Sequence, residues 1–134
     1  MPGTVDRSAR CPCGSAETYS LCCGRFHDGS AVPATAEQLM RSRYSAFAVG
    51  DGDYLYDTWD SAGRPAEIGL DDGLRWTRLE ILETVRGGPF DTDGVVEFRA
   101  HYRAARSAGA RHERSWFAKK GGRWVYVSGD TYAS

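Results

Sequence analysis

The position of its cysteines is the feature of this sequence that most constrains the fold. All four cysteines, Cys11, Cys13, Cys22 and Cys23, lie near the start of the chain, and none follows them. Thiols grouped in this way form one local constellation and cannot cross-link the larger remainder of the chain. That remainder must therefore fold without disulfide bonds.

The spacing of these cysteines predicts a metal site. Tetrahedral ligation requires four donors that converge at short distance, and two close pairs joined by a turn deliver them with few ordered residues. We therefore predict that Cys11, Cys13, Cys22 and Cys23 bind a metal ion. Four thiolates favour zinc, whereas iron and Cu(I) also accept sulfur ligands and stay as alternatives. Because no further ligand is evident nearby, the predicted site is closed and structural.

Two disulfides, four free thiols and a redox dithiol are the competing interpretations. A bridge within either pair demands a strained ring, and bridges between the pairs are uncommon in a reduced compartment. The adjacent cysteines also lack the CxxC spacing that redox dithiols normally use. His27 is the one imidazole close enough in sequence to replace a thiolate, and we interpret it as a bystander.

Composition restricts the other function classes. With 134 residues, of which 41% are hydrophobic, the chain suits one ordinary core with a small appendage. The formal net charge of -1 gives no electrostatic drive toward polyanions, so neither nucleic acid nor membrane is expected as a direct partner. The sequence contains no signal peptide and no run of about 20 apolar residues, which predicts a cytoplasmic protein.

Breaker residues after the cysteines set the predicted domain boundary. Gly29, Ser30 and Pro33 separate a metal-binding knuckle of residues 1–30 from a main domain of residues 31–134. In the main domain, the first predicted element is a helix.

Two helices are predicted at the start of the main domain. Thr35 and Gln38 form a capping-box pattern, and apolar residues then recur at helical spacing over residues 36–49. Gly50 ends this helix, and Asp51 caps a second, short helix.

Four side chains near these helices carry specific expectations. Phe26 is expected to dock the knuckle onto the main domain. Arg41, Arg43 and Ser45 fall partly off the apolar stripe, and we interpret them as a solvated helix face rather than as an anion site.

Strands follow the helices. Alternating apolar residues predict four of them, over residues 74–85, 94–104, 113–120 and 123–128. The Gly-Gly pair at residues 121–122 suits the positive φ values of a two-residue hairpin turn. That turn would pair Phe117 with Tyr126. It would also pair Trp116 with Val127.

Helices followed by an antiparallel sheet predict an α+β domain in which the sheet curls over the helices. If Phe98 lies opposite Phe117, one concave aromatic face carries four polar side chains as a candidate pocket. These are Tyr102, Glu113, Ser115 and Tyr126. The alternative is that Glu113 pairs with Arg103 or Arg111 and the tyrosines are part of the core.

Residues 11–24 resemble the SEC-C motif in the pattern C-P-C-G-S-x3-Y-x2-C-C-G. This metal-binding knuckle is known from the C-terminal tail of the SecA translocation ATPase and from several small bacterial proteins. The resemblance maps the ligands onto the four cysteines, with Cys23 where SecA has histidine. Ala16 and Glu17 replace a usual glycine and lysine, so the SecB and ribosome contacts of SecA tails are not carried over.

Runs behind the knuckle resemble the bacterial YchJ family. They lie at residues 41–47, 54–55, 58–59, 94–98, 112–117 and 122–124. The resemblance implies a cone-shaped fold similar to nuclear transport factor 2 (NTF2), with helices packed into a strongly curved sheet. It implies no established activity, although related cones include isomerases, dehydratases and ligand carriers.

The sequence therefore favours a non-enzymatic binding or adapter module that contacts a protein partner through its metal knuckle. The alternative is an enzyme or small-molecule carrier that uses the interior of the cone, with Glu113 as acid or base. A labile site that delivers or senses metal ranks lowest, because closed tetrathiolate sites resist exchange. No catalytic residue is assigned, and the mixed outer face around Trp116 leaves a dimer open.

Overall fold

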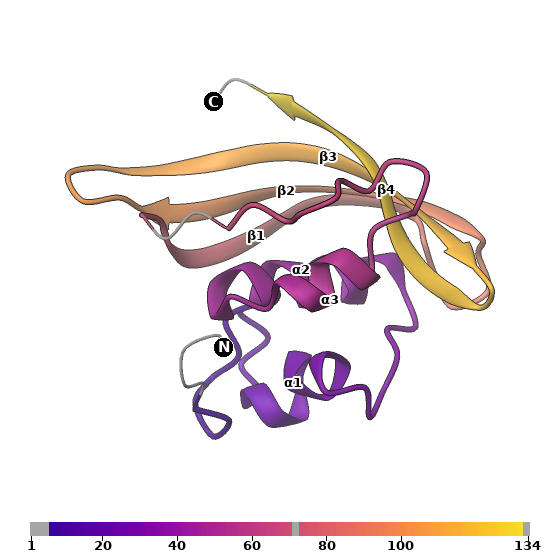
Figure 1. Cartoon of the computed structure of the whole chain (residues 1–134), viewed down its shortest axis with the longest axis horizontal. Coiled ribbons are helices and arrows are strands. Elements are labelled where there is room, and N and C mark those ends of the chain that lie inside the picture. The colour runs from indigo at the N-terminus through magenta and orange to yellow at the C-terminus, as the bar shows by residue number, and fades with distance from the viewer. Residues whose placement is uncertain (1–5, 71–72, 133–134) are drawn as a thin grey trace.

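A computed structural model describes residues 6–70 and 73–132. These residues are arranged in three layers (Figure 1). The helical elements are η1 (Tyr19–Leu21), α1 (Cys23–His27), α2 (Ala36–Val49) and α3 (Gly52–Asp57). The strands are β1 (Arg75–Arg86), β2 (Asp93–Arg103), β3 (Ala108–Lys120) and β4 (Arg123–Tyr132). The sheet covers one side of α2 and α3, and the knuckle with α1 lies on their other side.

Helix α2 begins and ends at the predicted residues. Thr35 Oγ1 accepts a hydrogen bond from the Gln38 amide at 3.1 Å, and Gln38 Oε1 accepts one from the Ala34 amide at 2.7 Å. In the usual capping box the side chain at this position bonds to the amide of the N-cap residue, here Thr35. Gln38 instead bonds to the amide of the residue before it, Ala34. Gly50, with φ of 79°, terminates the helix in the left-handed conformation. Asp51 then caps α3, as predicted, by accepting a hydrogen bond from the Tyr54 amide.

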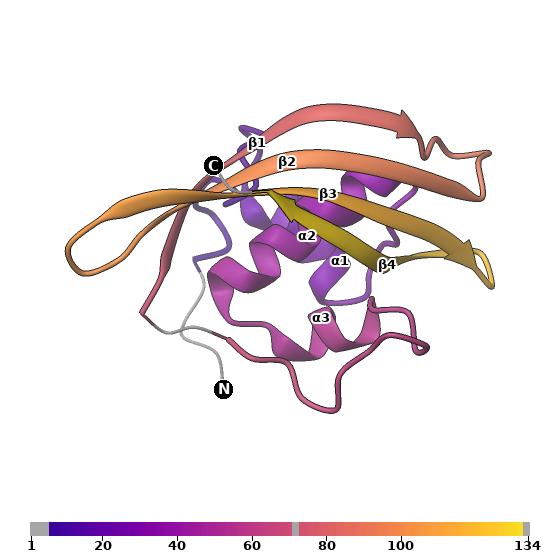
Figure 2. The same cartoon turned by 90° about the horizontal axis from the view of Figure 1, so that it is seen from above.

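The four strands form one antiparallel sheet in the order β1-β2-β3-β4, so each strand pairs with its neighbour in sequence. The sheet is strongly curved over the helices (Figure 2). Lys120 pairs with Arg123 across a two-residue turn in which Gly121 and Gly122 have φ of 59° and 79°. Both values are positive, which is the requirement of a type I′ hairpin turn. The predicted hairpin is therefore confirmed.

The register of β3 with β4 was predicted only in part. Phe117 pairs with Tyr126 as expected, but Trp116 lies opposite Ser128 and not opposite Val127. A β-bulge at this point places an extra residue in β4, which shifts the pairing beyond it.

The register of β2 with β3 also differs from the prediction. Phe98 pairs with Glu113 and not with Phe117, because β3 starts at Ala108 and extends the hairpin with β2. The turn is closed by a hydrogen bond from the Ala104 amide to the Ser107 carbonyl. The displacement is an even number of residues, so the same side chains still face the helices.

The main core lies between α2 and the inner face of the sheet. Its buried apolar residues include Leu39, Met40, Val96, Phe98, Phe117 and Trp124. A second cluster joins the knuckle to the helices, because Phe26 packs with Ala46, Tyr54 and Leu55. The expected docking role of Phe26 is thus confirmed.

The expectation of a solvated face on α2 was wrong. Arg43 is only 4% exposed and Ser45 is fully buried, while Arg41 is half-buried. The sheet covers one side of α2 and the knuckle covers another, so residues off the apolar stripe are enclosed as well. Among the described residues, no helix has the length and apolar character needed to cross a membrane.

Candidate metal centre and interior cavity

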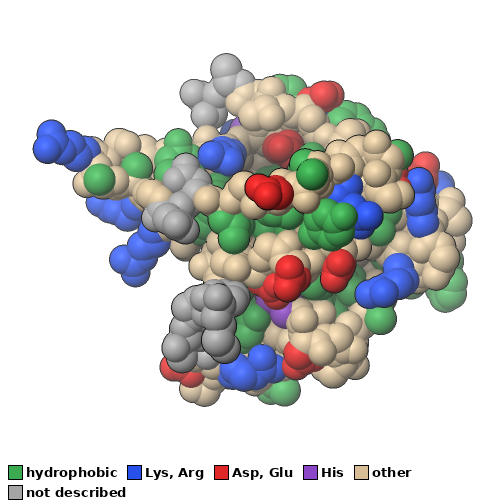
Figure 3. All heavy atoms as spheres, viewed as in Figure 1, with side chains coloured by type: hydrophobic (Ala, Val, Ile, Leu, Met, Phe, Trp, Pro, Cys, Tyr) green, Lys and Arg blue, Asp and Glu red, His purple; other side chains and the backbone are tan. Residues whose placement is uncertain are grey.

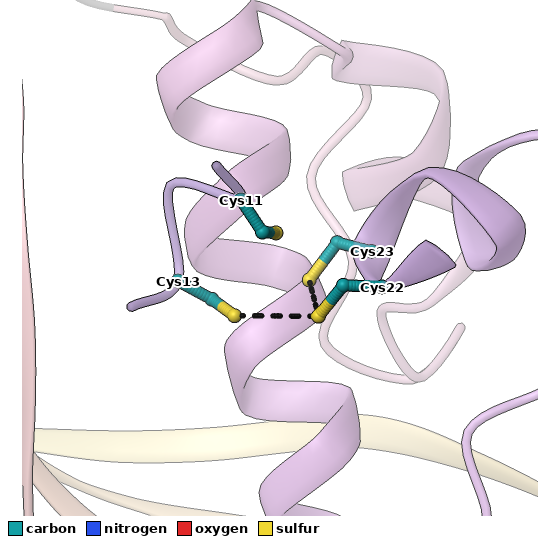
Figure 4. Close-up of side chains that lie close together, drawn as sticks. All are labelled: Cys11, Cys13, Cys22 and Cys23. Carbon is teal, nitrogen blue, oxygen red and sulfur yellow. Dashed lines mark hydrogen bonds between the residues drawn. The ribbon is translucent and has the colours of Figure 1, made fainter. Parts of the chain in front are cut away.

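The four cysteine sulfurs converge between the N-terminal loop and the start of α1 (Figure 4). All four lie within 4.8 Å of one another. The sulfur of Cys22 is 3.6 Å from that of Cys13 and 4.0 Å from that of Cys23. A tetrahedron of sulfurs, each about 2.3 Å from a zinc ion, has edges of about 3.8 Å. The sulfur positions therefore fit a tetrahedral metal ion.

The same separations exclude the disulfide interpretation for this structure. None of the four cysteines is joined in a disulfide bond. A disulfide bond is about 2.05 Å long, much shorter than the 3.6 Å between Cys13 and Cys22. Cys11, Cys13 and Cys23 are buried and Cys22 is half-buried, so the donors are also largely withdrawn from solvent.

Hydroxyl groups support two of the sulfurs. Gly14 adopts a φ of 83°, but its amide donates to the Cys11 carbonyl and not to a sulfur. Ser15 Oγ donates to Cys22 Sγ at 3.1 Å, and Ser45 Oγ lies 3.5 Å from Cys11 Sγ. Such donors stabilise a thiolate and orient it for a metal.

Ser45 was missed as a site residue by sequence reasoning. It lies on α2 and belongs to the main domain, far from the cysteines in sequence. Nothing in the spacing of the motif points to it, because its contact with Cys11 depends on how the knuckle packs on the helix. Arg41 makes a second such contact, since its Nη1 donates to the Cys13 carbonyl at 2.9 Å.

The thiols strongly influence one another. Hydrogen bonding from Cys13 and Cys23 lowers the pKa of the Cys11 thiol below its ordinary value. Hydrogen bonding to Cys11 in turn raises the pKa of Cys13 to about 11 and also raises that of Cys23. The protonation of these three sulfurs is thus linked, and a divalent cation would stabilise their thiolate forms.

His27 does not belong to the sulfur cluster. Its Nδ1 lies 2.5 Å from the Tyr19 hydroxyl and its Nε2 lies 2.8 Å from the Ser42 carbonyl. Nε2 thus ties the knuckle to α2, whereas Nδ1 ties α1 to η1 within the knuckle. The interpretation of His27 as a bystander to the ligands is confirmed.

A cavity of about 190 Å³ lies between the helices and the inner face of the sheet. Apolar groups form most of its walls, among them Met40, Phe47, Trp59, Trp76, Phe98 and Ala100. Glu113, Ser115 and Tyr126 of the predicted pocket also line it. Tyr102 does not line it; its ring packs edge-on against that of Trp76, with the two ring centroids 5.8 Å apart. The structure thus brings together three of the four predicted residues.

Glu113 accepts a short hydrogen bond from Ser115 Oγ. Within the described part of the chain it forms no ion pair with Arg103 or Arg111, which was the alternative expected from the sequence. Gly129 lies directly against the carboxylate, since a Cβ atom there would come within 2.6 Å of Glu113 Oε2. The absence of a side chain at residue 129 leaves the space that Glu113 occupies.

Arg43 is the residue of the cavity that sequence reasoning placed elsewhere. Its Nη1 donates to the Leu55 carbonyl at 2.9 Å and to Thr58 Oγ1 at 2.7 Å. Its guanidinium lies 4.7 Å from the ring centroid of Tyr126 and 5.3 Å from that of Trp59. Burial lowers the pKa of Arg43 to about 10, so the side chain is cationic at neutral pH.

Comparison with known protein families separates the chain into the same two parts, the cysteine knuckle and the domain that contains the sheet. The family description "YchJ, middle NTF2-like domain" matches residues 35–129, and the SEC-C motif matches residues 7–25. The chain belongs to the YchJ family. The fold expected for that family is confirmed by the α2–α3 layer and the curved four-stranded sheet.

Relatives and solved structures extend the likeness over nearly the whole chain. A UPF0225 protein of Corynebacterium glutamicum is 56% identical over 121 residues, which cover 90% of this chain and 96% of the relative. A solution structure of a SEC-C motif-containing protein from Rhodopseudomonas palustris has a TM-score of 0.80 and 35% identity, covering 92% and 98% of the two chains. A crystal structure of a SEC-C motif-containing protein from Psychrobacter arcticus has a TM-score of 0.75 and 27% identity, with 96% and 86% covered. These names describe no activity for YchJ proteins.

Proposed function

We propose that this YchJ protein holds one structural zinc ion on Cys11, Cys13, Cys22 and Cys23 and acts as a non-enzymatic binding module. The observation that carries the zinc assignment is the sulfur geometry, with separations of 3.6 and 4.0 Å close to the edges of a zinc tetrathiolate. A closed set of four sulfurs leaves no position for a catalytic water, so the metal serves structure. Reduced thiols of this kind are usual in the cytoplasm, which is the compartment we propose.

The proposed partner is a protein that contacts the outer surface of the metal knuckle. Leu21, which is 65% exposed, lies beside the ligand Cys22 on the turn η1. A metal would hold this turn rigid, and a rigid apolar side chain loses little conformational entropy on binding. Charges of both signs are spread over the face seen in Figure 3, which supports a protein partner over a nucleic acid.

Elemental analysis and native mass spectrometry of tag-free protein, purified without chelator, test the metal assignment. We expect one zinc ion per chain that resists mild chelation. Cys22→Ser should lose the metal, whereas Ser20→Ala, two residues away, should retain it. Iron at full occupancy would replace zinc in the proposal. An intact metal-free protein with oxidised cysteines would overturn the metal centre altogether.

Chemical cross-linking in cells tests the adapter role. Cross-linked species that form with the wild-type protein should disappear with Leu21→Glu and with Cys22→Ser, while Phe90→Glu, at an exposed site on the β1–β2 loop, should retain them. Species that persist in both knuckle variants would contradict the proposed surface. The cross-linked species could also be a homodimer. If it persists in the knuckle variants and is lost with Trp116→Glu, the outer face of the sheet is the surface through which the protein self-associates.

The cavity favours a second candidate function, the binding of a small molecule inside the NTF2-like domain. The observation behind it is a space of about 190 Å³ with Arg43, Glu113 and Ser115 in its walls. Glu113 is the side chain that would act as acid or base if the bound molecule reacts. Saturable binding of a small molecule, followed by nuclear magnetic resonance, tests this function independently of metal content.

A further inference from the structure

Arg43 is a buried cation in the wall of the cavity, on which the negative charge of Glu113 acts only from beyond ion-pair distance. Both of its hydrogen bonds to described residues leave from Nη1, to the Leu55 carbonyl and to Thr58 Oγ1. None of the ion pairs within the described part of the chain includes Arg43. A guanidinium has five N–H donors, and a buried charge without an ionic partner is costly. The remaining donors of Arg43 are thus available to an acceptor inside the cavity.

The charges around the cavity favour an anion. Arg43 and Arg111 carry positive charge in its walls, and Glu113 carries the one negative charge. Arg111 is exposed and lies over the ring of Trp76, 5.5 Å from its centroid, at the rim. Glu113 is engaged with Ser115 and forms no ion pair with either arginine. The net charge of the lining is therefore +1, and a bound monoanion would neutralise it.

The shape and surface of the cavity restrict the rest of the ligand. Its volume is about 190 Å³. An engineered apolar cavity of about 150 Å³ in another protein binds benzene, so the space here suits a single ring with one small substituent. The rings of Phe47, Trp59, Trp76 and Phe98 surround it, and flat aromatic walls pack well against a planar ligand.

We propose that the cavity binds a small organic monocarboxylate with one planar apolar ring, whose carboxylate accepts hydrogen bonds from the guanidinium of Arg43. This inference rests on the second candidate function and defines its ligand class. It does not depend on the zinc proposal. Arginine suits the role because its planar donors match the two oxygens of a carboxylate. The aromatic rings of Tyr126 and Trp59 contact the guanidinium and hold it in place.

Benzoate and its neutral isostere benzamide are the probes for the test, added to the metal-loaded full chain. The four tryptophan indole N–H signals report the location of binding. Benzoate should shift the signals of Trp59 and Trp76, which line the cavity, and leave that of Trp116 on the outer face unchanged. Benzamide should bind at least about tenfold more weakly, since a charged hydrogen bond is worth about 1.5–3 kcal/mol.

Three substitutions complete the test. Arg43→Met should weaken the binding of benzoate at least about tenfold, because it removes the cation. It should leave the affinity for benzamide unchanged, because Met keeps the length of the apolar stem. Arg103→Met, at the exposed end of β2, is the matched control and should bind benzoate as the wild type does. Glu113→Gln keeps a hydrogen-bond acceptor for Ser115. It should increase the affinity for benzoate by about threefold or more, since it removes a nearby negative charge.

Several results would overturn the proposal. Equal affinity for benzoate and benzamide would mean that no cation selects the ligand. Benzoate shifts confined to Trp116 or Trp124 would place binding outside the cavity, and the absence of any shift at millimolar benzoate would reject the ligand class. If Arg43→Met does not fold, an unchanged benzoate affinity in Glu113→Gln overturns the proposal alone. Zinc content measured on the same samples separates failure of this inference from failure of the metal assignment.

Discussion

The sulfur of Cys11 lies 3.5 Å from the hydroxyl oxygen of Ser45, on the buried side of helix α2. The two residues belong to different sequence motifs, the SEC-C knuckle and the NTF2-like domain. Their contact makes the main domain part of the environment of the cysteine cluster. It predicts that metal affinity depends on a residue outside the cysteine motif.

Ser45→Ala should weaken zinc binding by about fivefold, because it removes a hydrogen bond to a thiolate worth roughly 1 kcal/mol. Competition against a chromophoric chelator measures the effect. Ser107→Ala in the β2–β3 turn is the control and should bind zinc as the wild type does. Equal zinc affinity in Ser45→Ala and the wild type would show that the hydroxyl does not support Cys11.

Removal of the metal should loosen the knuckle and leave the sheet intact. The knuckle is too short to bury much apolar surface by itself, whereas β2 and β3 are held by the main core. Hydrogen exchange after chelation should show faster exchange of the amides of Tyr19 and Cys22 and little change at Val96. Global exchange at the same rate in both regions would mean that the two parts unfold together.

Phe117→Ala should lower the free energy of unfolding by about 3–5 kcal/mol, because it leaves a cavity in the main core. Phe117 is 2% exposed and contacts Tyr126 across β3 and β4, with ring centroids 5.9 Å apart. Phe90→Ala is the matched control, since Phe90 is 99% exposed. Denaturant unfolding of both variants measures the difference, and similar losses would contradict the assigned core.

Alkaline pH should destabilise the protein through its buried tyrosines. Burial raises the pKa of Tyr44, Tyr54 and Tyr126 to about 12 each, and that of Tyr19 likewise. A raised folded-state pKa means that the native protein holds these protons more tightly than the unfolded chain. Their contribution is therefore complete below about pH 10, the ordinary tyrosine pKa, and is lost as pH rises toward 12.

Ultraviolet titration of tyrosinate and denaturant unfolding between pH 9 and 12 check this prediction. Tyr126→Phe removes one of the four groups and should lose less stability over that range than the wild type. Tyr56→Phe, on the exposed surface of α3, should follow the wild-type curve. A wild-type stability that stays constant up to pH 12 would rule out the burial effect.

Local features of this fold could be predicted from the sequence, because the residues that determine them are close together along the chain. The capping of α2 by Thr35 and the turn at residues 121–122 depend on a few neighbouring positions. The convergence of the four sulfurs follows in the same way from the short spacing of the cysteines.

Features that depend on tertiary packing could not be predicted from the sequence. Residues 108–112 lack the β-branched and large apolar side chains typical of strands, and they join β3 by pairing with the backbone of β2. The β-bulge beside Trp116 leaves no signal in the alternation of residues. Ser45 is buried because the knuckle covers its side of α2, and Arg43 is buried because the α3 segment and Tyr126 of the sheet enclose its guanidinium.

The enclosure of α2 has a consequence for how such proteins can evolve. From Leu39 to Ala46, every residue except Arg41 is buried, under the sheet, the α3 segment or the knuckle. A substitution that suits one neighbour of this helix must also suit the other. The two parts are therefore expected to be inherited as a pair, and the knuckle of one relative should not be exchangeable for that of another without compensating changes in α2.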